Sequence, residues 1–293
     1  MMCTALKYKN VMGRNFDYEK SYKEQIVRID ANEFSNKYKV IGMATGMVQD
    51  YPLLYDGMNE HGLCAAGLAF EGNAKYCRYQ NDKMNVAAFD VTFWILSNFK
   101  TIDEVEKAFE NVNIWCEPFS DEFPNSDLHW FVCDQTGSLI IEQTKNGLHI
   151  YHSDGVLTNN PGYMEQLEYH HFSIAMVGDV DNTLESPEWY SRGRETDGLD
   201  GGYSSDERFN KVSYLKQRLE AADHNFNDVT QGFHLLGSVE QVYGVTSVDD
   251  LFEYTIYSIV YDMESLKVYI KTYDHLDIGV FKLDDATLRR YTI

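Results

Sequence analysis

The sequence predicts an α+β fold in which two β-sheets pack face to face between two layers of helices, a four-layer αββα sandwich. Three observations favour it. Residues 1–80 contain short alternating or apolar stretches typical of strands, residues 86–112 carry apolar side chains at helical spacing, and the chain then runs through strands, helices and strands again. The order of these elements alone also allows other α+β folds.

The N-terminal part of the chain is expected to be β-structure. Alternating or apolar stretches predict strands at residues 4–9, 25–30, 39–44, 51–58 and 63–70. The sequence Asn59-Glu60-His61-Gly62 predicts the turn between the last two.

A helical layer is expected next. Residues 86–98 are apolar at helical spacing, and residues 101–104 form a capping box that opens a second helix over 105–112. Three strands of a meander then follow at 130–134, 138–143 and 148–152.

The C-terminal half is expected to add helices and a closing hairpin. Helices are predicted at 163–176, at 206–222 with Ser205 as the cap, and at 228–239, after a polar loop at 195–202. Strands at 253–260 and 266–274 are expected to pair as that closing hairpin.

Composition limits the class of protein. The chain has 293 residues, 44% of them hydrophobic, and no linker or repeat, so one domain over 1–293 is expected. A net charge of −21 argues against nucleic acid and anionic membranes as partners. The N-terminus has no apolar signal-peptide core and no run reaches transmembrane length, so the expected compartment is the cytoplasm.

Cys3 is the first candidate for chemistry. Once the residues before it are removed, it carries a thiol with an ordinary pKa of about 8.5 and an α-amine of about 7.7–8.0, so the amine can act as base for its own thiol. Arg14 and Asp17 supply a cation and an anion ten residues later. The alternatives without a catalytic role are a chance cysteine on a frayed terminus for Cys3, and a structural ion pair for Arg14 and Asp17.

The other cysteines and the histidines suggest no metal site. The five cysteines have no CxxC spacing, and Cys64, Cys116 and Cys133 are expected in the core. His149 and His152 would point to opposite faces of a strand, and no cluster completes a metal shell around these residues or around the adjacent pair at 170–171.

Several short sequence segments follow one another in a specific order along nearly the whole chain. They are Met2-Cys3-Thr4, Gly13-Arg14-Asn15-Phe16-Asp17, Asp56-Gly57-Met58-Asn59-Glu60-His61-Gly62-Leu63, Ala66-Gly67-Leu68, Leu128-His129-Trp130, Leu157-Thr158-Asn159-Asn160-Pro161, Ser204-Ser205-Asp206-Glu207-Arg208-Phe209 and Phe233-His234-Leu235-Leu236-Gly237. In this order they resemble the choloylglycine hydrolase family, the N-terminal-nucleophile amidases that include bile salt hydrolases and penicillin V acylases.

The resemblance implies a role for each matching residue. Cys3 would be the nucleophile, and Arg14 and Asp17 would hold and tune its thiol and α-amine. Asn159 would donate to the oxyanion, and Arg208 would complete the charged network. Taken from the residues alone, Asn159-Asn160-Pro161 is equally typical of a turn. Arg208 lies in the first turn of a helix, where a cation opposes the macrodipole, which favours a functional reason for it.

Two departures from the family pattern affect expectations. The family carries Asn or Tyr where this chain has Ala69, and uses the backbone N–H there as the second oxyanion donor, which alanine keeps. The polar side chain that shapes the leaving-group pocket is lost, so substrate range is expected to change more than chemistry. Methionine excision generally needs a small second residue, and Met2 is not small. Either translation starts at Met2 or both methionines leave by another route, and the mature chain is expected to begin at Cys3.

The expected activity is hydrolysis of a linear amide between a bulky apolar acyl group and a small polar amine, with glycine and taurine conjugates of bile salts as the first substrate choice. The alternatives are penicillin V acylase or another N-acyl amide hydrolase, and a non-catalytic small-molecule binder that keeps the fold. Tyr18 and Phe70 would line an acyl pocket, although aromatic core is the base expectation. No cofactor or metal is needed, and the family suggests a homotetramer.

Overall fold

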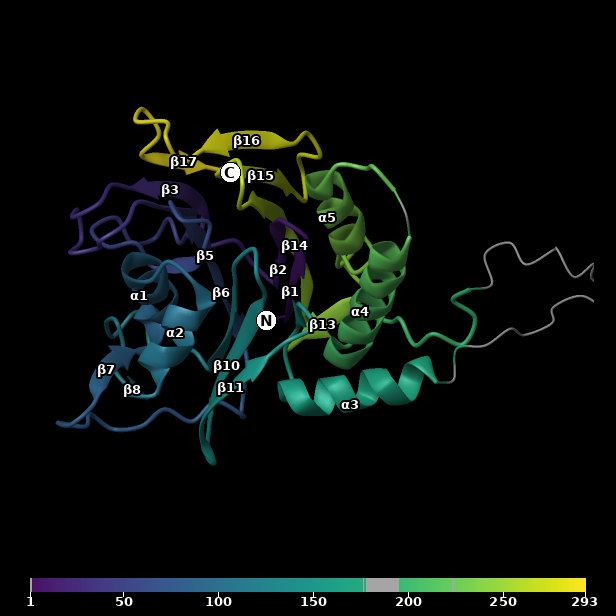
Figure 1. The fold of residues 1–293 in the computed structure, drawn as a ribbon, viewed down its shortest axis with the longest axis horizontal. Helices are drawn as coiled ribbons and strands as arrows, with labels where there is room; N and C mark the ends of the chain where they lie inside the picture. The colour runs from purple at the N-terminus through teal and green to yellow at the C-terminus, as the bar shows by residue number, and fades with distance from the viewer. Residues whose placement is uncertain (1, 176, 178–194, 223) are drawn as a thin grey trace, which may run out of the picture.

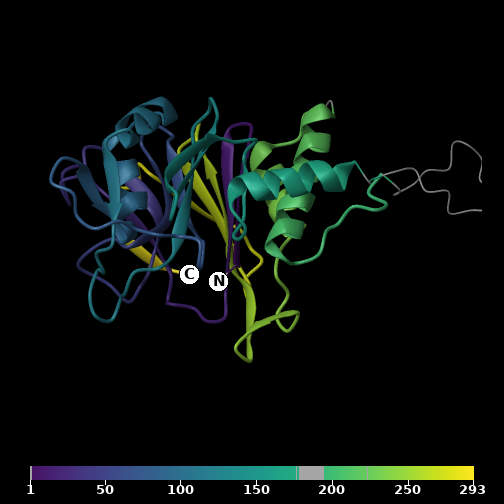
Figure 2. The same ribbon diagram turned by 90° about the horizontal axis from the view of Figure 1, so that it is seen from below.

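The chain forms four layers in a computed structural model that describes residues 2–175, 177, 195–222 and 224–293. Figure 1 shows helices α1 and α2, then a sheet containing β5, β6 and β10, then a sheet containing β1, β2 and β14, and finally α4 and α5. The same succession of layers is visible from below in Figure 2. The prediction of a four-layer αββα sandwich is therefore confirmed, whereas a single domain over 1–293 stays a prediction.

The first sheet places the N-terminal strand in its interior. Its spatial order is β12 (Val156–Leu157), β1 (Met2–Tyr8), β2 (Val11–Tyr18), β14 (Leu251–Asp262), β15 (Lys267–Thr272) and β16 (Gly279–Lys282), and β13 (Thr246–Val248) pairs with β14. All of these pairs are antiparallel. Because β1 has a neighbour on each side, the start of the described chain is held within the sheet.

The second sheet follows the chain more closely. Its order is β11 (Gly147–His152), β10 (Ser138–Thr144), β9 (Leu128–Cys133), β6 (Cys64–Ala69), β5 (Leu54–Asn59), β4 (Val40–Ala44), β3 (Gln25–Ile29) and β17 (Arg290–Thr292). The turn between β5 and β6 lies where it is predicted, with Gly62 at φ +78° and Asn59 Oδ1 accepting from the N–H groups of His61 and Leu63.

Helices cover the outer face of each sheet. Helix α1 (Val91–Asn98) packs on β5 and β6, and α2 (Ile102–Phe109) packs on β10. On the other side, α4 (Ser205–Ala221) and α5 (Asp228–Gly237) pack on β1, β2 and β14, and α3 (Tyr163–Ile174) packs on α4. The predicted helix over 163–176 includes Met176, which lies outside the described residues.

The helical layer beside α1 differs from its prediction. Residues 84–87 form β7 (Met84–Ala87), a short 3₁₀ turn follows at Ala88–Asp90, and residues 112–115 form β8 (Val112–Trp115), which pairs parallel to β7. Helix is expected over 86–98 and 105–112; the first prediction begins too early, and the second begins and ends too late. Apolar residues at short spacing fit a helix and a buried strand equally well, which is why the boundaries were misplaced.

Successive side chains along the central strands point alternately into two separate hydrophobic cores. On β6, Cys64, Ala66 and Leu68 face the core between the sheets, whereas Ala65 faces the core beneath α1 and α2. Cys64 and Cys133 are buried as expected, but Cys116 is exposed, so its predicted place in the core is wrong. Cys116 follows strand β8 and begins a polar surface loop, where its apolar neighbours in sequence do not enclose it.

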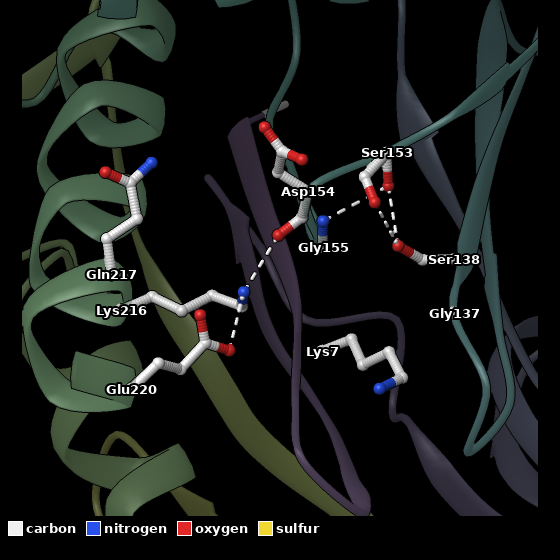
Figure 3. A pocket seen from close by; sticks show the side chains of 9 residues that line it. All are labelled: Lys7, Gly137, Ser138, Ser153, Asp154, Gly155, Lys216, Gln217 and Glu220. Atoms are coloured by element: carbon white, nitrogen blue, oxygen red, sulfur yellow. Dashed lines mark hydrogen bonds and ion pairs between the residues drawn. The ribbon is translucent and has the colours of Figure 1, made fainter.

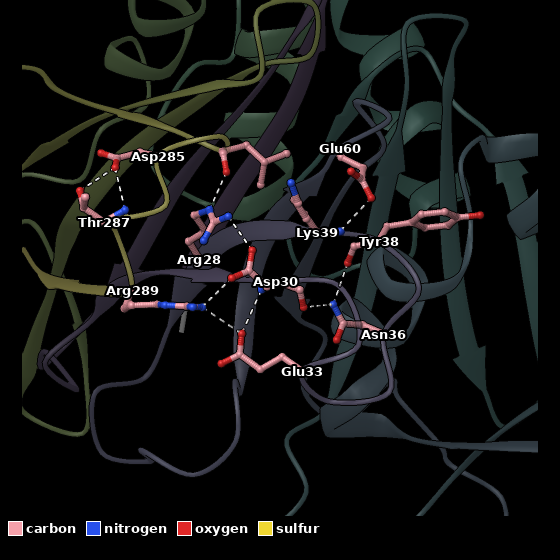
Figure 4. A network of polar contacts seen from close by, with 11 residues as sticks. Arg28, Asp30, Glu33, Asn36, Tyr38, Lys39, Glu60, Asp285, Thr287 and Arg289 are labelled. Atoms are coloured by element: carbon pink, nitrogen blue, oxygen red, sulfur yellow. Dashed lines mark hydrogen bonds and ion pairs between the residues drawn. The ribbon is translucent and has the colours of Figure 1, made fainter.

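The C-terminal segment is tied back across β3 by a polar network (Figure 4). The buried Arg28 donates from Nε to the carbonyl of Leu283 at 2.6 Å and forms an ion pair with Asp30 at 2.6 Å. Asp30 and Glu33 also contact the exposed Arg289. Within the described ranges, none of the helices combines the length and the apolar character needed to cross a bilayer.

Candidate active site

Cys3 lies on strand β1 and is completely buried. It pairs with Phe16 of β2, and further along β1 Ala5 pairs with Leu157 of β12, so the strand that carries Cys3 is held on both sides. Its backbone N–H donates to Asn159 Oδ1 at 2.7 Å, and Arg14 Nη2 lies 3.4 Å from its Sγ atom. The thiol therefore faces a cation and the backbone nitrogen faces an acceptor.

Arg14 is held rigidly by groups on three other strands. Its Nη1 atom forms a salt bridge of 2.6 Å with Asp56 of β5, and Nη2 donates to the carbonyl of Gly67 on β6 at 2.8 Å. Asp56 also accepts hydrogen bonds from the hydroxyl groups of Tyr257 and Tyr261 on β14. Burial lowers the pKa of the Arg14 guanidinium, but its attraction to Tyr257, Cys3 and Asp56 outweighs burial and keeps the pKa above its ordinary value.

A glycine beside Asp56 brings a helix close to this network. A Cβ atom on Gly57 would lie 2.9 Å from Leu96 Cδ1 and 3.0 Å from the carbonyl oxygen of Ile41. Because glycine carries no such atom, α1 can approach β5 closely, and the strand that carries Asp56 is packed from behind.

Asp17 is a buried carboxyl group at the edge of the site. Its Oδ1 atom accepts from Thr255 at 2.6 Å, whereas Oδ2 has no hydrogen-bond partner among the described residues. Burial raises the pKa of Asp17 to about 7, Glu253 acts in the same direction, and Arg208 and the bond from Thr255 oppose the shift. Asp17 pairs with Met2 in the β1–β2 ladder, so it stands opposite the residue that precedes Cys3.

The side-chain amide of Asn159 has a fixed orientation. Its Oδ1 atom accepts from Cys3 N and from Arg208 Nη2 at 2.8 Å, so Nδ2 points the other way and donates to the carbonyl of Ala69 at 3.0 Å. One amide hydrogen is used by Ala69, and among the described residues the second has no acceptor.

Arg208 links the start of the chain to Asn159. Its Nη1 atom donates to the carbonyl of Cys3 at 2.6 Å and to Thr4 Oγ1 at 2.7 Å, and Nε donates to the carbonyl of Tyr203 at 3.0 Å. It enters the site from the beginning of α4, whose capping box is formed by Ser204 and Glu207. Ser205, the predicted cap, instead accepts the backbone N–H of Asn159 at 2.7 Å.

The two aromatic residues predicted to line an acyl pocket have different surroundings. Phe70 is 1% exposed and stacks on His129, so its ring is part of the packed interior. Tyr18 is half-buried and stacks on Tyr22 with 5.5 Å between ring centroids. Ala69, at the end of β6, is 3% exposed.

Six of the predicted site residues therefore meet at the N-terminal end of β1, namely Cys3, Arg14, Asp17, Ala69, Asn159 and Arg208. Sequence reasoning assigned no role to Asp56, Thr255, Tyr257 or Tyr261. Asp56 opens one of the segments that carry the family resemblance, which was a usable signal. The three β14 residues lie on one strand, with an irregularity in register between Thr255 and Tyr257, and nothing in the sequence indicates that β14 pairs with β2.

A separate cavity of 420 Å³ contains none of the predicted site residues (Figure 3). It is lined by residues of β1, β10, α4 and neighbouring loops, among them Lys7, Ser138, Asp154 and Lys216. Lys216 is already paired with Glu220 at 2.8 Å and with the carbonyl of Asp154 at 2.8 Å. The lysine therefore holds the cavity wall together.

The histidines that the sequence analysis weighed are engaged with neighbouring side chains. His152 contacts Glu106 at 3.1 Å, and His170 contacts Asn210 at 2.8 Å. In the part of the chain that the structure describes, no group of three or more His, Cys, Asp or Glu side chains is arranged to hold a metal ion.

Comparison with known proteins finds relatives that match almost the whole chain. The bile salt hydrolase/transferase of Lactiplantibacillus plantarum is 40% identical over 305 residues, covering 98% of this chain and 94% of that protein. The bile salt hydrolase/transferase of Clostridium perfringens is 32% identical, with 98% and 94% covered.

Solved structures resemble the fold over its whole length. The crystal structure of a variant of conjugated bile acid hydrolase from Clostridium perfringens gives a TM-score of 0.89 at 30% identity and covers 100% of this chain and 97% of that chain. The structure of penicillin V acylase from Agrobacterium tumefaciens gives a TM-score of 0.72 at 18% identity and covers 97% of this chain and 87% of that chain. This likeness shows the fold alone. A family model described as linear amide C–N hydrolases, choloylglycine hydrolase family, matches residues 1–292. The chain belongs to that family.

Proposed function

We propose that this enzyme hydrolyses the amide bond of bile salts conjugated to glycine or taurine, with Cys3 as an N-terminal nucleophile. The observation that carries the proposal is the setting of Cys3, whose sulfur lies 3.4 Å from Arg14 Nη2 while its nitrogen lies 2.7 Å from Asn159 Oδ1. The substrate class is supported by the relatives from Lactiplantibacillus plantarum and Clostridium perfringens, which are named for bile salts.

The first step forms a thioester. After removal of the residues before Cys3, its α-amine accepts the thiol proton and the sulfur attacks the amide carbon. Arg14 stabilises the thiolate because a nearby cation favours the charged form. The tetrahedral oxyanion collapses, the carbon–nitrogen bond breaks, and the proton held by the α-amine passes to the leaving glycine or taurine nitrogen.

Two donors would hold the oxyanion. Asn159 Nδ2 has one hydrogen that is not used by the carbonyl of Ala69, and the backbone N–H of Ala69 is the second donor in the proposal. A fixed donor of this kind contributes about 2.7–4 kcal/mol to the transition state. Water then attacks the thioester, with the α-amine as base, and releases the bile acid and the free thiol.

Asp17 and Arg208 would position the new terminus. Asp17 stands opposite Met2 in the ladder, so loss of Met2 leaves its buried carboxyl group beside the new α-ammonium, which suits their opposite charges. Arg208 holds the Cys3 carbonyl and Asn159 together. The α-amine is therefore expected to remain close to the sulfur throughout the cycle.

The test is a substrate panel assayed on protein whose N-terminus has been verified as Cys3. We expect glycine and taurine conjugates of bile acids to give the highest kcat/KM, ahead of penicillin V and long-chain N-acyl amino acids. A preference for penicillin V or an acyl amino acid would replace the substrate class and keep the mechanism. Binding of a conjugate without turnover would favour a non-catalytic binder.

Variants at the N-terminus separate chemistry from folding. Cys3→Ser and Cys3→Ala should fold and lose nearly all turnover, and a chain that keeps Met2 should be folded and inactive because its Cys3 nitrogen is an amide. Full turnover by a verified Met2-retaining protein would rule out the α-amine as base. We further propose that the enzyme works as a homotetramer in the cytoplasm, which sedimentation analysis and cell fractionation test.

A further inference from the structure

The imidazole of His129 lies between the two segments that carry the proposed oxyanion donors. His129 belongs to β9, and its ring stacks on that of Phe70 with 4.3 Å between centroids and 8° between planes. Its Nε2 atom lies 2.9 Å from the carbonyl oxygen of Thr158. Phe70 follows Ala69 and Thr158 precedes Asn159, so one buried side chain contacts both segments.

Both ring nitrogens of His129 are engaged. The Thr158 carbonyl can only accept, so Nε2 carries a hydrogen. Nδ1 lies 3.1 Å from Glu142 Oε1, which also accepts the backbone N–H of Tyr163 at 2.9 Å. The side chains of His129 and Glu142 are 0% and 4% exposed. The ring therefore has a fixed orientation, with Nε2 towards the Thr158 carbonyl and Nδ1 towards the Glu142 carboxyl group.

A polar pair of this kind is not needed to fill the space. An apolar ring could stack on Phe70, and burial of a histidine and a carboxyl group carries a desolvation cost. What the pair adds is a directed hydrogen bond to the loop that carries Asn159. Two further side chains hold that loop: Ser205 accepts from Asn159 N at 2.7 Å, and Gln166 donates to Asn159 O at 2.5 Å.

We propose that His129, oriented by Glu142, is a positioning residue for the oxyanion site, which sets the Asn159 loop against the Ala69 end of β6. The proposal rests on the proposed function, because it assigns His129 to the oxyanion of that reaction. His129 acts through Thr158 and Phe70, and in the described part of the chain no hydrogen bond joins it to Cys3. Loss of His129 should therefore slow steps that form an oxyanion and spare the reactivity of the thiol.

Two reagents separate these effects. p-Nitrophenyl acetate acylates the thiol through a tetrahedral oxyanion, whereas iodoacetamide alkylates it by direct displacement without one. Because Cys116 is exposed, alkylation is followed on the N-terminal peptide by mass spectrometry, and the acylation rate of Cys3→Ala is subtracted. The ratio of the two rates reports the oxyanion site alone.

Two substitutions at position 129 test the contact that matters. In His129→Gln the amide nitrogen can occupy the place of Nε2 and still donate to Thr158, whereas in His129→Asn it can occupy only the place of Nδ1 and contact Glu142. His129→Asn should lower acylation roughly 10–100-fold, as small displacements of catalytic groups do, with alkylation unchanged within about twofold. His129→Gln should stay within a few-fold of wild type.

The control is His152→Asn, which removes another histidine paired with a glutamate, 68% exposed and on the outer strand β11. It should change neither rate. Equal loss of both rates in His129→Asn, no loss, or equal behaviour of the Asn and Gln variants would overturn the proposal. If His129→Asn does not fold, Glu142→Gln serves instead, and an unchanged ratio there would overturn it.

The same assay distinguishes failure of the role proposed for His129 from failure of the proposed function. A processed wild-type enzyme that is acylated by p-nitrophenyl acetate but does not turn over conjugated bile salts would remove the substrate assignment and leave the role of His129 to be decided by the ratio. Turnover of conjugates by the wild type, together with an unchanged rate ratio in folded His129→Asn, would keep the substrate assignment and overturn the role of His129.

Discussion

Arg14 and Asp56 form a salt bridge of 2.6 Å in which neither side chain is exposed to solvent. Removing one partner of such a pair leaves the other charge buried without compensation. Asp56→Asn should therefore lower the free energy of unfolding by about 3–5 kcal/mol, measured by urea denaturation.

The matched control for Asp56 is an exposed ion pair. Arg289 is 58% exposed and contacts Asp30 and Glu33, so Arg289→Ala should cost less than about 1 kcal/mol. A similar loss of unfolding free energy in both variants would mean that burial does not govern how much the Arg14–Asp56 pair contributes to stability.

Asn159→Ala should lower kcat by about 10²–10³ and change KM little, because an oxyanion donor acts on charge that develops in the transition state. Steady-state kinetics with a glycine conjugate measures both constants. Asn160→Ala is the control, since Asn160 is exposed and its side chain donates to the carbonyl of Glu71 at 2.8 Å, away from Cys3 N and Arg208. An unchanged kcat in Asn159→Ala would leave Asn159 with a structural role only.

Asp17 should make stability fall as the pH rises from about 4 to 7. Its pKa is about 7 in the fold and 3.8 in the unfolded reference, so in this window the folded chain binds the extra proton. The contribution of Asp17 to the free energy of unfolding is fully present near the lower end of this pH range, and it declines by about 1.4 kcal/mol per pH unit as the pH rises. Urea denaturation of Met2-retaining protein at pH 5 and 7 measures the slope. Asp17→Asn should remove this component, and an identical slope in the variant would assign the pH dependence to other groups.

Ala69 should affect substrate preference more than the nucleophile. Ala69→Asn restores a polar side chain beside the proposed leaving group, and one hydrogen bond is worth about 0.5–1.5 kcal/mol, so kcat/KM for glycine or taurine conjugates should rise several-fold. Ala69→Tyr should shift preference towards penicillin V by adding aromatic surface. The ratio of kcat/KM for the two substrates is the measurement. A flat ratio across wild type and both variants would show that position 69 does not face the substrate.

Sequence patterns predicted most strands and helices because burial on one face leaves a regular spacing of apolar residues. The failures have local causes. Residues 84–87 and 112–115 form strands of only four residues, whose apolar side chains also fit a helix end, and the short edge strands β12, β16 and β17 offer too few residues for a pattern.

Within the site, the family resemblance identified the residues around Cys3, but spacing could not supply their partners. Tyr257 and Tyr261 reach Asp56 only because β14 pairs with β2 across more than half of the chain. The role inferred for His129 depends likewise on contacts with Thr158 and Phe70, which follow two different strands, β12 and β6. Which strands become neighbours is a property of the whole fold, and local periodicity does not encode it.

The interior position of β1 has a consequence for how activity is acquired. Cys3 and Asn159 are 156 positions apart, and Cys3 and Arg208 are 205 apart. Contacts that close such large loops carry an entropic cost and form slowly compared with local structure. After dilution from denaturant, helix and sheet signals should recover first, and catalytic turnover should return only when the distant segments have docked on β1. Enzyme activity is then a kinetic probe of the last stage of folding.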